Sequence, residues 1–74
     1  MDYLTAGTTS PAELAMVHSE NANRTPVDEA GRFETMRLCK MALEALDLVH
    51  WSDQITSELV RRKIGKAQER QGLQ

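Results

Sequence analysis

Two short phrases constrain the fold of this chain more than any other feature. They are Ser10-Pro11-Ala12-Glu13 and Thr25-Pro26-Val27-Asp28, each with a hydroxyl residue, then proline, and an acid three positions after the hydroxyl. The hydroxyl oxygen can accept from an unpaired amide of the first helical turn, proline suits the first helical position, and the acid bonds back to the cap. Each phrase predicts a helix start, and no strand-like alternation is present. We therefore expect an all-α protein.

The size of the chain limits how stable a lone monomer can be. With 74 residues it has room for one core, and a chain of this length buries only roughly 60–65% of its unfolded surface. A single cysteine rules out an intrachain disulfide, and only three residues are aromatic. We expect burial to be completed by dimerisation, as a homodimer.

Charge and hydropathy favour a cytoplasmic setting. The net charge of −2 is close to neutral, so bulk electrostatics do not predict a polyanion binder. Apolar runs are only a few residues long, which excludes a membrane span, and the N-terminus lacks the basic and apolar regions of a signal peptide.

Three regions are expected along the chain. Residues 1–9 resemble an extended N-terminal arm, held to the body through Tyr3 and Leu4 or by a neighbouring molecule. A single helical domain follows over residues 10–70, and residues 71–74 form a polar tail.

The first helix is expected at about 11–21, with Leu14 and Val17 on its inner side, and asparagines end it in a turn at 21–24. The second begins at Pro26 and reaches about Val49. At roughly 100° per residue its apolar and charged residues separate. The apolar side holds Leu38, Ala42, Ala45, Leu46 and Val49, with Cys39 and Leu43 adjoining, and the opposite side holds Glu29, Lys40, Glu44 and Asp47.

The segment after Val49 permits two architectures. Ser52 or Asp53 could cap a third helix over 53–70 that folds back as an antiparallel hairpin on the second. Alternatively the second helix continues as one rod, because no glycine or proline forces a stop and Met41, Leu48 and Ile55 recur every seven residues. The hairpin is favoured, since a rod leaves more apolar surface uncovered.

A group of large apolar residues is the first candidate binding surface. Phe33 and Trp51 both fall among the charged residues of a helical wheel, where an aromatic suggests a contact anchor. In the competing interpretation, Phe33 covers the first helix and Trp51 fills the bend. If they mark an interface, the partner-binding residues are Phe33, Met36, Met41, Leu48 and Trp51.

A basic run near the C-terminus is the second candidate surface. Its candidate phosphate contacts are Arg61, Arg62, Lys63 and Lys66, with Arg70 one turn further on. We expect these side chains to point in several directions rather than form one stripe, and cations are common in the last turns of a helix. No aromatic residues interleave with them for stacking on bases.

Neither a catalytic nor a metal or cofactor site is predicted. Cys39 lies on the apolar side of its helix and is expected to be a buried, inert thiol. One cysteine and two distant histidines do not match zinc-ligand spacing. His50 is expected to cap the end of the second helix and His18 to lie on the surface. A small ligand is expected only at a subunit interface.

These features favour a non-catalytic protein-binding module, acting as a small regulator, adaptor or inhibitor of another protein. Small helical chains of this kind are similar in style, though not in any specific motif, to accessory and inhibitor proteins of phages and other mobile elements. The alternatives are a nucleic-acid-binding regulator that uses the basic segment and a structural subunit of a larger assembly.

Overall fold

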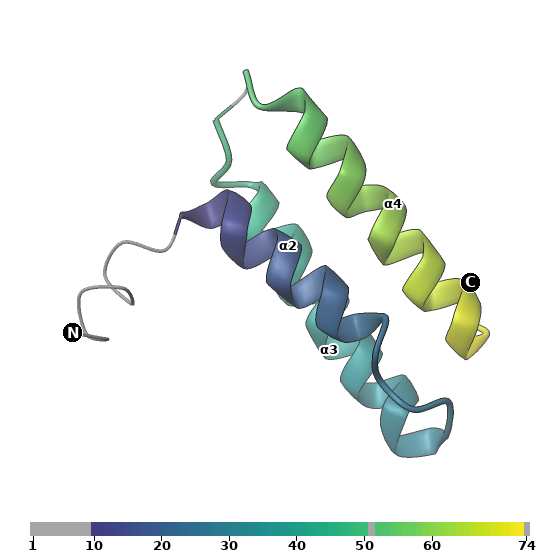
Figure 1. Cartoon of the computed structure of the whole chain (residues 1–74). Helices are drawn as coiled ribbons and strands as arrows, with labels where there is room; N and C mark the ends of the chain where they lie inside the picture. The colour runs from purple at the N-terminus through teal and green to yellow at the C-terminus, as the bar shows by residue number, and fades with distance from the viewer. Residues whose placement is uncertain (1–9, 51, 74) are drawn as a thin grey trace.

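The computed structural model describes residues 10–50 and 52–73, and within them all regular structure is α-helical. Three helices follow in order: α2 (Pro11–Ala22), α3 (Glu29–Leu46) and α4 (Gln54–Gln71). The chain reverses at each of the two turns, so that α3 runs back along α2 and α4 runs back again (Figure 1). The most extensive helix–helix contact is between α2 and α3, and α4 packs on both of them. Within the described residues, no helix is long and apolar enough to cross a membrane.

The first predicted cap is confirmed. Ser10 Oγ accepts from the Glu13 amide at 3.2 Å, and Glu13 Oε1 accepts from the Ser10 amide at 3.4 Å. Pro11 occupies the start of α2, where its missing N–H costs no hydrogen bond. This reciprocal pair fixes the beginning of α2 where the sequence placed it.

The second predicted cap is wrong. The N-cap of α3 is Asp28, whose carboxylate accepts from the Gly31 amide at 2.6 Å, so the helix begins at Glu29 rather than Pro26. The Thr25 hydroxyl instead donates back to the Asn21 carbonyl at 3.0 Å. Thr25 is unavailable as a cap because it closes the end of α2.

The turn between α3 and α4 confirms the hairpin over the continuous rod. The helix α3 ends at Leu46, three residues before the expected Val49, and Asp53 caps α4 by accepting from the Thr56 amide at 3.3 Å. At the end of α3, the backbone amides of Leu48 and Val49 donate to the carbonyls of Ala45 and Leu46. His50 Nδ1 lies 2.6 Å from Ser52 Oγ.

The hydrophobic core is made mostly of small side chains. The apolar face predicted for the second helix is buried at Leu38, Cys39, Ala42, Ala45 and Leu46, while Val49 is half-buried against it. The other helices contribute Ala15, Ala22, Val60, Ile64 and Ala67.

The buried side of α2 differs from the prediction. Leu14 and Val17 are 40% and 47% exposed, and the residues that face inward are Ala15, Ser19 and Ala22. Small side chains let two helix axes approach closely. The inward face of α2 therefore carries small side chains and its larger apolar residues lie partly exposed.

The end of α4 belongs to the fold and is not part of a polar tail. Gly72 ends the helix in the left-handed region at φ 73°, and the Leu73 amide donates to the Gln68 carbonyl at 2.8 Å. The buried Gln71 side chain donates to the Pro26 carbonyl at 2.8 Å, and Arg70 Nη1 donates to the Thr25 carbonyl at 2.9 Å. These bonds attach the last turn of α4 to the α2–α3 turn.

Candidate functional site

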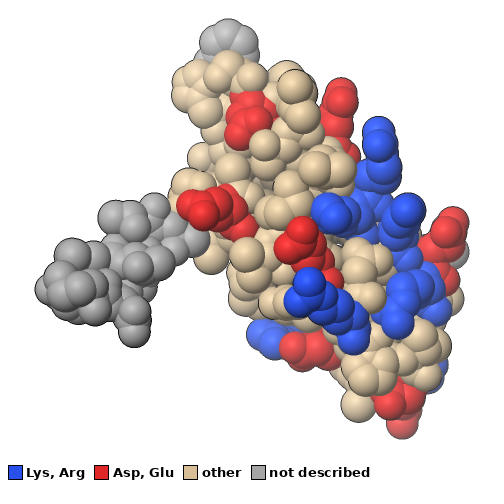
Figure 2. Space-filling model, in the orientation of Figure 1, with Lys and Arg blue, Asp and Glu red and all other residues tan. Residues whose placement is uncertain are grey.

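An open groove lies between α2 and α4. It has a volume of about 500 Å³ and is lined by Glu20, Asn23, Arg24, Leu59, Arg62, Lys63 and Lys66. Lysine and arginine side chains gather on this side of the molecule, over α4 and the end of α2 (Figure 2).

Asn23 holds the two walls of the groove together. Its Nδ2 donates to the Ser19 carbonyl on its own helix and to the Lys63 carbonyl on α4, both at 2.9 Å. The second bond joins residues 40 positions apart and sets the register of α2 against α4. Because both acceptors are backbone carbonyls, the Asn23 side chain ties the end of α2 directly to the backbone of α4.

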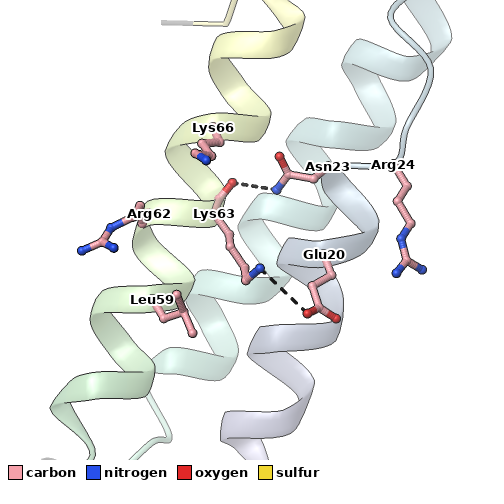
Figure 3. Close-up of a pocket in the computed structure, with 7 residues that line it drawn as sticks. All are labelled: Glu20, Asn23, Arg24, Leu59, Arg62, Lys63 and Lys66. Carbon is pink, nitrogen blue, oxygen red and sulfur yellow. Dashed lines mark hydrogen bonds and ion pairs between the residues drawn. The ribbon is translucent and has the colours of Figure 1, made fainter.

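The charges in the groove are mostly positive and mostly unpaired. Lys63 Nζ reaches across to Glu20 Oε2 at 3.9 Å (Figure 3). Arg24 and Arg62 extend on either side of the groove in the same view, and Lys66 lies one turn beyond Arg62. Within residues 10–50 and 52–73, none of these last three cations has an ion-pair partner. The groove therefore presents an uncompensated positive field.

The structure divides the basic run between different surfaces. Arg62, Lys63 and Lys66 line one groove, whereas Arg61 does not, and Arg70 is bonded to the α2–α3 turn. Residues three or four positions apart share a helix side, so the sequence spacing already places Lys66 near both Arg62 and Lys63. Arg24 was missed, because it reaches the groove only through the packing of α2 on α4.

An apolar edge continues the groove toward the other end of α4. Ile55 is 81% exposed and Leu59 is 39% exposed. Both share the face that carries Arg62 and Lys66, since the four positions are separated by four, three and four residues. The edge of α4 is thus apolar near the α3–α4 turn and basic toward its C-terminal end.

The predicted partner-binding residues that the structure describes are distributed along α3 and the α3–α4 turn. Phe33 and Met36 are together on the outer face of α3 and, with Glu29, Arg32 and Leu73, line a shallow cavity of about 170 Å³. Phe33 is 65% exposed and so does not cover the first helix.

The other predicted anchors lie elsewhere. Met41 is half-buried with its sulfur 3.4 Å from Arg37 Nη1, and Leu48 is 74% exposed at the α3–α4 turn. Arg37 also pairs with Glu34 at 2.6 Å, and this hydrogen bond lowers the pKa of the Glu34 carboxyl. Trp51, like the arm over residues 1–9 with Tyr3 and Leu4, lies outside the described residues.

Cys39 is buried, and burial raises the pKa of its thiol. A raised pKa means that the folded state favours the neutral thiol. Its contribution to stability is complete below the pKa in the unfolded chain, about 8.5, and is lost as pH rises through the folded value. We expect the midpoint of urea denaturation to fall as pH increases above that value, and the decrease to disappear in Cys39→Ala.

Comparison with known proteins supplies no relative. No family model matches the sequence, and neither a curated protein nor a solved structure matches it significantly.

Proposed function

We propose that this chain is a non-catalytic protein-binding module, a cytoplasmic regulator or adaptor, that holds an acidic segment of another protein in the α2–α4 groove. The observation that carries the proposal is a groove lined by four cations, Arg24, Arg62, Lys63 and Lys66, and by Leu59. A carboxylate-bearing segment with apolar side chains matches both parts of this surface.

The Glu20–Lys63 pair suggests how an acidic segment would enter. The pair is long, at 3.9 Å, and both side chains are about one-third or more exposed. A partly exposed pair of this kind is worth roughly 0–1 kcal/mol. A carboxylate of the partner can therefore replace Glu20 beside Lys63 at little cost.

Two features favour a protein over a nucleic acid as the occupant. Among the residues that the structure describes, the groove is lined by an exposed leucine and a carboxylate but by no aromatic side chain for base stacking. The apolar edge formed by Ile55 and Leu59 would face a phosphate backbone without gain, whereas it can pack on side chains of a peptide.

The proposal is tested with isotope-labelled protein and three probes at one ionic strength. The probes are a helical peptide with glutamate and leucine at four-residue spacing, the same peptide with lysine for glutamate, and a 20-base-pair DNA duplex. The glutamate peptide should shift amide resonances of Arg24, Leu59 and Lys66, and the lysine peptide should not. Tighter binding of the duplex, or a glutamate peptide that leaves these resonances unchanged, would overturn the proposal.

Charge variants assign the binding to the groove. The double variant Arg62→Glu, Lys66→Glu should bind the glutamate peptide about tenfold or more weakly, since two favourable charge pairings become repulsive. Arg61→Glu is the matched control on the same helix and should change the affinity by less than about twofold. Glu20→Gln should strengthen binding by removing the competing carboxylate. Equal weakening by Arg61→Glu and the double variant would show that net charge alone is responsible.

A further inference from the structure

The outer face of α3 carries a pattern that is complementary to itself when reversed. Its members are Arg32, Met36, Leu43 and Asp47, with separations of four, seven and four residues. These separations place all four on one side of the helix. The pattern is symmetric about a point between Cys39 and Lys40. When the helix is reversed, Arg32 takes the place of Asp47, and Met36 takes the place of Leu43.

This stripe is open to solvent. Met36 and Leu43 are 48% and 38% exposed, and Arg32 and Asp47 are exposed as well. Phe33, 65% exposed, extends the apolar area beside Met36. These residues are not among the buried residues of α3, and Leu73, just after the end of α4, lines the shallow cavity beside Met36.

The two charges are badly placed for an isolated molecule. Arg32 lies in the first turns of α3 and Asp47 is its C-cap, so each sits near the end of the helix dipole that carries its own sign. Within the described residues neither has an ion-pair partner. An opposite charge from a second molecule placed beside Arg32, and another beside Asp47, would offset these unfavourable interactions.

We propose that two copies of this chain pair through α3, antiparallel about a twofold axis. Met36 then packs against Leu43 of the second copy, and Arg32 faces its Asp47, with each contact made twice by symmetry. The shallow cavity beside Phe33 and Met36 lies where the C-terminal end of the other α3 arrives. Each helix dipole also lies beside an oppositely directed one.

Charge swaps test this pairing by sedimentation equilibrium. The natural chain should show a concentration-dependent dimer. Arg32→Asp and Asp47→Arg should each weaken the dimer by about tenfold or more, because each places two like-charged pairs across the axis. Arg61→Asp, on the exposed side of α4, should leave it unchanged.

Mixing the two swapped chains is the decisive step. In an equimolar mixture the aspartate introduced at position 32 faces the arginine introduced at position 47, and the natural Asp47 of one chain faces the natural Arg32 of the other. The heterodimer should regain the natural affinity, as should the homodimer of the double variant. A monomeric natural chain, or single variants that dimerise normally, would overturn the proposal, as would a mixture that stays monomeric.

The dimer and the proposed acidic ligand can fail independently. The swapped residues lie on α3, outside the α2–α4 groove. Arg32→Asp, when monomeric and fully helical by circular dichroism, should still bind the glutamate peptide.

Discussion

Leu46→Asp should unfold the protein at room temperature. Leu46 is 7% exposed, and within residues 10–50 and 52–73 the buried core has ten residues, five of them alanine. An ionised carboxylate at this position loses its hydration without gaining a partner, and the packing of the leucine side chain is lost as well; together these cost about 5 kcal/mol or more. Small domains have a free energy of unfolding of about 5 kcal/mol at the lower end of the usual range. Far-UV circular dichroism should show loss of most of the helical signal.

Leu48→Asp is the matched control for this experiment. The same chemical change occurs two positions along the chain, but Leu48 is 74% exposed at the α3–α4 turn. Its circular dichroism spectrum should match that of the natural chain, with unfolding free energy changed by no more than about 0.5 kcal/mol. A folded Leu46→Asp variant, or an equally damaged Leu48→Asp variant, would show that the buried face of α3 is assigned incorrectly.

Gly31→Ala should destabilise the fold although alanine is the better helix former. A Cβ atom at this position would lie 1.7 Å from the Pro26 carbonyl oxygen and 3.0 Å from the Asp28 carboxylate. The obstacle is backbone, so the α2–α3 turn must move and the bond from the Gly31 amide to Asp28 is disturbed. We expect a net loss of about 2 kcal/mol, measured by urea denaturation, despite a propensity gain near 1 kcal/mol.

Gly65→Ala is the reference for the effect of propensity alone. Gly65 is exposed in the middle of α4, and a Cβ there would meet no atom within 4 Å. This variant should gain about 0.5–1 kcal/mol of stability because alanine has less backbone entropy to lose. If both variants were stabilised, the close approach of Pro26 to Gly31 would be disproved.

The sequence predicted the helix start correctly at the first capping phrase but not at the second. Both have a hydroxyl residue, a proline and an acid at the same spacing, yet only Ser10 caps its helix. Thr25 lies one turn after the end of α2, where its hydroxyl bonds to Asn21, while its carbonyl accepts from Arg70 and Gln71. A local sequence pattern contains no information about groups on other parts of the chain that form hydrogen bonds with the same residue.

The candidate groove shows the same division. That Lys66 shares a helix side with Arg62 and with Lys63 follows from spacings of four and three residues and was available in the sequence. The contribution of Arg24 and Glu20 was not, because it depends on the Asn23 side chain that joins α2 to the Lys63 carbonyl. Whether four cations share a site depends on the register between two helices.

The sequence by itself determined the helical class, the start of α2 and the apolar face of α3. Each of these depends on residues within a few positions of one another, through caps and helical periodicity. Only the tertiary structure decided that Ala15 and Ser19 are buried in place of Leu14 and Val17, and that Gln71 closes the α2–α3 turn. The physical reason is that the distance between helix axes and the sharing of buried carbonyls depend on all three helices together.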